Sequence, residues 1–164
     1  MFKFELNAET MKMMRVLSLV VVAGAFLTFT GCKKGGSDPK PITEVQFNKL
    51  NKTWKVQSVT FDNTDRTSEY TAANFQLVIG GTVNAATYTT SGRPFPSPWK
   101  GSGTWTFGAN PETQIIRDKD TADALNLTYA VIESTLTISF QFSGTGYTSR
   151  TESVQGPWVF TFTL

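Results

Sequence analysis

Histidine is absent from this 164-residue chain, and cysteine occurs only once, as Cys32. The missing histidine removes the commonest general base and the commonest metal ligand of proteins. A single cysteine excludes an internal disulfide and a zinc or redox site of the CxxC type. The acidic residues fall in segments with turn-forming sequences, so no carboxylate pair suited to hydrolysis lies on an apolar face. We therefore expect a protein that is not an enzyme and that carries no cofactor and no metal.

Charge is also sparse, because Asp, Glu, Lys and Arg make up only 17% of the residues. The 15 basic and 13 acidic residues nearly balance, and no basic stripe runs along any segment. Nucleic acid is therefore not an expected partner. The length suits one small domain, and we expect a monomer.

The N-terminal segment has the order of features found in exported proteins. Residues 15–30 form an apolar run behind the basic residues Lys12 and Arg15. The run is shorter than the roughly 20 apolar residues of a membrane span, and it fits the core of a signal peptide over residues 1–31. Glu5 and Glu9 oppose a positively charged start, so we expect the true start codon at Met11.

The apolar run ends in Phe29-Thr30-Gly31-Cys32, which resembles the lipobox of bacterial lipoproteins. The resemblance implies cleavage before Cys32 and attachment of a diacylglycerol, with acyl chains such as palmitate, to its thiol. Residues 32–42 then form a flexible linker rich in Gly, Pro and Lys. Lys33, where an aspartate would retain the protein at the inner membrane, implies an outer-membrane anchor on the periplasmic or surface face. The alternative is a buried cysteine after a chance apolar run.

Residues 43–164 are dominated by strand-like alternation of apolar and polar side chains. Ile42 to Asn51 is the one predicted helix, with Thr43 and Gln46 at capping-box spacing and Ile42 and Phe47 placed for a hydrophobic staple. Eight strands follow without a helix that could connect parallel neighbours, so the sheet should be antiparallel. Closing it into an up-and-down barrel would remove both edges; a β-sandwich is the alternative. The predicted strands lie around Trp54, around Leu77, at 86–90, around Trp105, at 113–117, at 127–131, at 136–142 and at 158–164.

Two short motifs resemble the lipocalin-like domains common in Bacteroidota lipoproteins. The first is Leu50-Asn51-Lys52-Thr53-Trp54-Lys55-Val56 after a short helix, and the second is Gly101-Ser102-Gly103-Thr104-Trp105-Thr106-Phe107. The resemblance covers roughly residues 43–164 and implies an eight-stranded barrel that binds a small hydrophobic ligand or lipid. Lys52 stands where lipocalins have glycine, and Arg150 is the candidate for the late arginine that packs on the first tryptophan.

The predicted inward face of the barrel is unusually aromatic, so the interior is either a solid core or a narrow apolar pocket. Segment 93–99 contains two rings without a place in any strand, on a connector stiffened by three prolines. These rings either form an exposed rim or fold back to cover the end of the barrel. With a pocket, the function is ligand binding; with a solid core, it is a structural or interaction module that contacts an envelope protein or glycan through its loops. The candidate ligand-binding residues are Trp54, Trp105, Trp158, Tyr129, Phe95 and Trp99.

Segment 118–123 holds three acidic residues, but their spacing departs from that of a calcium loop, and a solvated turn is the favoured interpretation. Its Asp120-Thr121-Ala122 resembles the O-glycosylation motif of exported Bacteroidota proteins. That resemblance makes Thr121 a candidate acceptor.

Overall fold

The computed structural model describes residues 38–146 and 154–164, of which Lys40–Leu164 belong to one compact unit. In these described ranges no helix is long and apolar enough to cross a membrane. The elements are α2 (Ile42–Leu50), β1 (Thr53–Phe61), β2 (Thr64–Asp65), α3 (Thr67–Ala72), β3 (Gln76–Thr82), β4 (Ala85–Ser91), β5 (Ser102–Phe107), β6 (Gln114–Arg117), β7 (Leu125–Ile132), β8 (Thr135–Phe142) and β9 (Gly156–Thr163).

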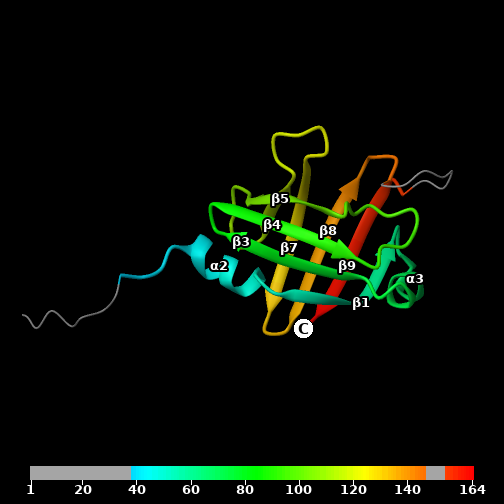
Figure 1. Cartoon of the computed structure of the whole chain (residues 1–164), viewed down its shortest axis with the longest axis horizontal. Coiled ribbons are helices and arrows are strands. Elements are labelled where there is room, and N and C mark those ends of the chain that lie inside the picture. The colour runs from blue at the N-terminus through cyan, green and yellow to red at the C-terminus, as the bar shows by residue number, and fades with distance from the viewer. Residues whose placement is uncertain (1–37, 147–153) are drawn as a thin grey trace, which may run out of the picture. The chain divides into compact units, whose positions relative to one another are not determined.

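Eight strands, β1 and β3 to β9, form a closed antiparallel barrel (Figure 1). Each strand pairs with the next in the chain, and β9 pairs with β1 from Lys55↔Thr163 to Phe61↔Trp158. This closure confirms the predicted all-β up-and-down barrel and excludes the β-sandwich. It also gives the last strand a partner, so that no long edge is left open.

Alternation decides which side chains enter the barrel. In β9, Trp158, Phe160 and Phe162 are buried, whereas the residues between them are exposed or half-buried. The same pattern in the other strands directs their apolar residues into one core cluster, which includes Trp54, Trp105 and Trp158. Since every second residue of a strand faces the same side, the sequence pattern specifies which strand residues face this interior.

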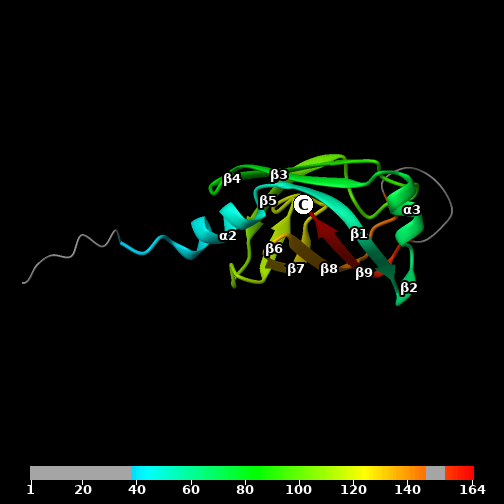
Figure 2. The same cartoon turned by 90° about the horizontal axis from the view of Figure 1, so that it is seen from below.

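Helix α2 covers one end of the barrel, on the side opposite α3 (Figures 1 and 2). Its Phe47 ring stacks on Trp105 at 6.1 Å between centroids, and the Leu50 carbonyl accepts a 2.9 Å hydrogen bond from the Trp54 indole. The helix was predicted correctly, but its capping box was not. Pro41 occupies the cap position and Thr43 lies inside the helix, while Ile42, the expected staple residue, is 44% exposed.

The short elements β2 and α3 were not predicted. Beyond Lys55, β1 no longer pairs with β3, and the segment at 64–72 occupies the side of β1 that β3 leaves. Arg66 N donates to the Val59 carbonyl at 2.9 Å, and Val59 N donates to the Thr67 hydroxyl at 3.0 Å. These bonds satisfy backbone groups that the divergence of the two strands would otherwise leave unpaired.

Candidate functional site

The interior of the barrel is filled by side chains. Its internal cavity measures about 20 Å³, room for a single water molecule. Apolar residues of β3, β6, β7 and β8 line it together with Tyr88, Trp99, Trp105 and Arg117. A lipid or retinoid needs a site of roughly 300 Å³ or more, so none fits this interior as it stands.

Trp99 lies inside the barrel although it belongs to the connector between β4 and β5. Its side chain is 2% exposed and packs at 5.7–6.3 Å between centroids against four rings, and the guanidinium of Arg117 lies 5.4 Å from its ring centroid. The four rings are Phe75, Tyr88, Phe140 and Phe160. Trp99 therefore fills the space that a ligand would need.

The backbone around Trp99 is fixed by side chains from three directions. Arg93 donates to the Trp99 carbonyl at 3.1 Å, and Arg117 donates to the Pro98 carbonyl at 3.0 Å. On the other side, Thr90 donates to the Lys100 carbonyl at 2.6 Å. These bonds hold the connector in one place, so Trp99 is a fixed part of the core.

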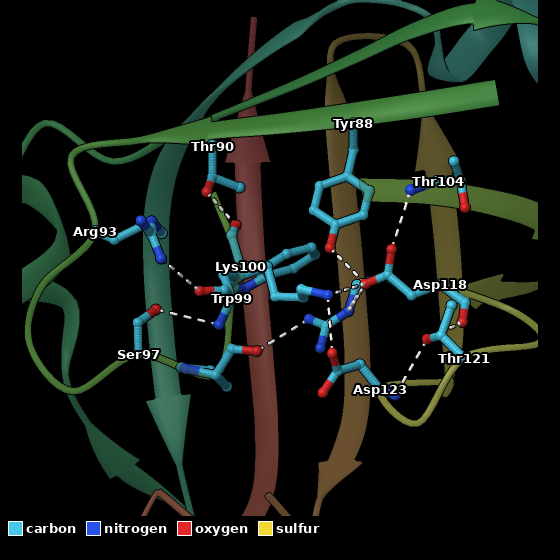
Figure 3. A network of polar contacts seen from close by, with 12 residues as sticks. Tyr88, Thr90, Arg93, Ser97, Trp99, Lys100, Thr104, Asp118, Thr121 and Asp123 are labelled. Carbon is cyan, nitrogen blue, oxygen red and sulfur yellow. Dashed lines mark hydrogen bonds and ion pairs between the residues drawn. The ribbon is translucent and has the colours of Figure 1, made fainter. Parts of the chain in front are cut away.

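A buried polar network surrounds Asp118 beside this connector (Figure 3). Its carboxylate accepts hydrogen bonds from the Tyr88 hydroxyl at 2.8 Å and from Thr104 N at 3.0 Å. The guanidinium of Arg117 lies 3.6 Å away and the Lys100 ammonium 3.9 Å away. Burying a carboxylate is costly unless it is paired and hydrogen-bonded, and all of these partners offset that cost. The network therefore joins the 92–101 connector to β4, β5 and β6.

Local backbone geometry explains why the network needs these residue types. Asp118 has a φ of +50°, a region that aspartate and asparagine tolerate better than most residues. A Cβ at Gly103 would lie 2.0 Å from an oxygen of the Asp118 carboxylate and 2.7 Å from the Tyr88 ring. Only glycine leaves room for this approach, so the Gly103 of the sequence motif serves the polar network.

A second connector side chain, Tyr70 of α3, also enters the core. It is 1% exposed, and its ring packs edge-on against Phe75 at 5.3 Å and Phe160 at 5.1 Å. Burial raises the pKa of its hydroxyl well above the ordinary value, a shift that the Ser97 hydroxyl partly opposes. Tyr70 and Trp99 thus pack against the same two rings, and together they close the α3 end of the barrel.

The predicted ligand-binding residues fall into two groups. Trp54, Trp105, Trp158 and Tyr129 are buried in the packed core, where among them only Trp105 lines the small cavity. Phe95 and Trp99 separate: Phe95 is 48% exposed, as on a rim, whereas Trp99 is 2% exposed, which agrees with the alternative that the connector folds a ring back onto the barrel. The connector folds its second ring back because the barrel interior offers that ring four aromatic contacts.

The polar network was missed because its members are far apart in the sequence. Tyr88 and Asp118 are separated by 30 positions and meet through the pairing of β4, β5 and β6. The sequence favours a solvated turn at 118–123, yet Asp118 is 4% exposed. A basic and an acidic residue side by side at the end of a predicted strand were the only available signal.

The described residues bear on only some of the remaining sequence predictions. Thr121 is exposed, and its hydroxyl donates to the Asp118 carbonyl at 2.7 Å. Within residues 38–146 and 154–164, no three His, Cys, Asp or Glu side chains gather as a metal site would require. The signal peptide, Cys32 and Arg150 lie outside the described residues.

The chain was compared with protein-family models, with curated proteins and with solved structures, and none of them matches.

Proposed function

We propose that the protein is a lipid-anchored, non-catalytic module of the bacterial cell envelope that contacts a partner protein through its loops. The observation that carries this proposal is the filled barrel, whose internal cavity of about 20 Å³ leaves no room for a lipid-sized ligand. A solid interior favours the interaction module over the carrier of a small hydrophobic ligand. The resemblance to lipocalin-like domains then concerns the shape of the barrel and not the ligand site.

Helix α2 and the loops lie at opposite ends of the barrel. The lipobox-like segment and the linker precede α2, which covers one end, whereas α3 and the connectors 92–101 and 118–124 lie at the other.

Phe95 is the best candidate contact residue at this loop end. It is a 48% exposed ring between Pro94 and Pro96, in a connector fixed by the buried Trp99 and by Arg117. Aromatic side chains dominate the binding energy of many protein interfaces. A connector whose backbone is already held in place loses little conformational freedom on binding. The fitting partner is a protein with an apolar pocket that receives one ring.

The first experiment tests the filled interior. Tryptophan fluorescence of the full chain is titrated with a panel of fatty acids, retinoids and porphyrins, and we expect no saturable change. The control is Trp99→Ala with indole as the probe, because an apolar cavity left by a ring takes up a molecule of that shape. Saturable binding of a panel member by the unmodified chain would restore the ligand carrier.

The second experiment tests the loop contact in intact cells. A photo-crosslinking phenylalanine analogue is placed at Phe95 and, as a matched control, at Val78, which is 38% exposed on the outer face of β3. We expect a discrete protein adduct from position 95 and none from position 78. Equal adducts from both positions, or none from position 95, would contradict the loop contact.

The third experiment tests the anchor. Mass spectrometry of the mature protein should find a diacylglycerol on an N-terminal Cys32, and Cys32→Ala should move the protein from the membrane fraction to the soluble fraction. An unmodified thiol in the mature protein would overturn the anchor while leaving the loop contact open to its own test.

A further inference from the structure

The outer wall of the barrel carries almost no charge. Among the described strands, charged residues occur only as Lys55, Asp65 and Arg117, and Arg117 is buried. Strands β7, β8 and β9 lie side by side (Figure 1) and contain none. Their outward positions hold threonine more often than any other residue, with one serine, one glutamine, one asparagine and the apolar residues Ala130, Ile132, Pro157 and Val159. A closed barrel has no edge that charge must protect, so this wall is free to serve another purpose.

Two hollows on this wall of the described barrel are larger than the cavity inside it. One, of about 350 Å³, lies over β6 and β7, and the other, of about 320 Å³, lies over the end of β7 and the start of β8. Thr128 lines the first and Ala130 the second. Because these residues are two positions apart on β7, they face the same side. The two hollows therefore open on the same face of β7, and together they are called the groove below.

The groove is lined by neutral side chains that can donate and accept hydrogen bonds. Gln114 pairs in register with Thr128 across β6 and β7, and Ala130 pairs with Thr137 across β7 and β8. Asn126 and Thr135 extend the polar lining, and Ile116 and Ile132 add apolar surface. Glu133 is the one charged residue of the lining.

We propose that this groove binds a neutral oligosaccharide chain. Amide and hydroxyl side chains both donate and accept hydrogen bonds, as sugar hydroxyls require, and the isoleucines can cover the apolar faces of sugar rings. An anionic polymer would find no cation in the groove, so its charge would have no compensation on binding. A second copy of the chain is less favoured, because a stable protein interface buries about 800 Å² on each partner and the groove is a shallow part of one wall.

The experiment measures binding of neutral hexasaccharides of glucose, with α-1,4, β-1,4 and α-1,6 linkages, to the full chain by calorimetry and by amide chemical shifts. Hexagalacturonate is the anionic control. We expect one neutral series to bind with a Kd of about 1 mM or tighter, with shifts at Asn126 and Thr128 and none with the anionic chain. No binding by any neutral series, or shifts confined to the loop end, would overturn the proposal.

Matched variants assign the binding to the groove. Thr128→Lys places a charge in the groove, and Thr89→Lys places the same charge on the exposed outer face of β4. We expect binding to weaken at least tenfold in the first and to stay unchanged in the second. Asn126→Ala, at an exposed position, replaces Thr128→Lys if that variant does not fold. Binding that weakens equally in Thr128→Lys and Thr89→Lys, or that weakens because the oligomeric state changes, would contradict a site in the groove. Crosslinking from position 95 should persist in all three variants, which separates this inference from the loop contact.

Discussion

The two ends of the barrel are closed in different ways. At the α2 end, the Phe47 ring of the helix stacks on Trp105, and the Trp54 indole donates a hydrogen bond to the Leu50 carbonyl of the helix. At the loop end, Trp99 and Tyr70 enter the core from connectors, and a buried ion network around Asp118 holds one of those connectors. The α2 closure is a helix that packs against the end of the barrel, whereas the loop-end closure consists of side chains that belong to the barrel core.

This difference indicates where the molecule can change without losing its fold. The α2 closure depends on few contacts of one short helix, so it can open locally. The rings of the loop-end closure pack within the cluster of Phe75, Phe140 and Phe160, which belongs to the barrel core. Opening this closure would therefore disrupt the packing of the strands. We therefore expect mutations at the two ends to differ in kind as well as in size.

Trp99→Ala should have the largest effect. Removing a fully buried ring leaves a cavity that the surrounding strands cannot fill, and the free energy of unfolding should fall by about 3–5 kcal/mol. Chemical denaturation followed by far-UV circular dichroism measures this loss. Trp99→Phe is the matched control and should lose less, because the indole Nε1 has no hydrogen-bond partner among the described residues. A loss below about 1 kcal/mol for Trp99→Ala would mean that the connector is not part of the core.

Phe47→Ala should cost about 3 kcal/mol at most, the lower end of the range for a buried phenylalanine. This variant should differ from Trp99→Ala mainly in which part of the molecule opens. Amide hydrogen exchange should accelerate in α2 while the barrel strands stay protected, because the helix can detach without opening the barrel. Uniform acceleration across β7 to β9 would show instead that both closures stabilise the barrel in the same way.

Asp118→Asn should lower the free energy of unfolding by about 2 kcal/mol, since it leaves the buried Arg117 without its closest carboxylate. Asparagine is the suitable replacement because it tolerates the positive φ at this position. Asp118→Ala should cost about 1 kcal/mol more on backbone grounds alone. Equal stability of Asp118→Asn and the unmodified chain in thermal unfolding would mean that the network contributes no net stability.

Most of the fold could be predicted because alternation of side chains is a local signal. In β8, Leu136, Ile138 and Phe140 point inward for the same reason that makes their pattern visible in the sequence. Helix α3 could not be predicted, because six residues carry too little periodicity, and its position depends on where β1 leaves β3. Whether Thr43 would cap α2 also depended on where the preceding chain enters, and Pro41 occupies the cap instead.

The candidate site was less predictable because it depends on distances that no local pattern contains. The aromatic interior was foreseen as either solid or hollow, and only the position of Trp99 decides between these alternatives. An aromatic residue among prolines is equally consistent with an exposed rim and with a buried ring. The neutral groove was invisible for a related reason: its Gln114, Thr128 and Thr137 come from three strands and become neighbours only through register.

High pH should act on the α2 end through Tyr129. Its hydroxyl donates to the Pro111 carbonyl, and burial, followed by the nearby charge of Glu112, raises its pKa from 10.0 to about 12. Because the unfolded chain then loses this proton first, the free energy of unfolding should fall between pH 10 and about 12. Tyr129→Phe should show a smaller decline over this range, and comparing the two chains subtracts the similar effect of Tyr70. Parallel pH profiles would contradict the raised pKa.

The smallest effect should come from the ion pair between Lys100 and Asp123, which lies over the network at the loop end. Its nitrogen and oxygen are 2.9 Å apart, but the two side chains remain 30% and 43% exposed. Exposed pairs typically contribute about 0.2–1 kcal/mol, and salt screens them. A double-mutant cycle with Lys100→Ala and Asp123→Ala should therefore give a coupling energy below about 1 kcal/mol that shrinks at high ionic strength. The single Lys100→Ala variant should lose more than Asp123→Ala, because the ammonium also lies 3.9 Å from the buried Asp118 carboxylate. A large coupling energy that salt does not reduce would mean that this surface pair belongs to the buried network. Charge, rather than the Trp99 ring, would then be the main support of the loop end.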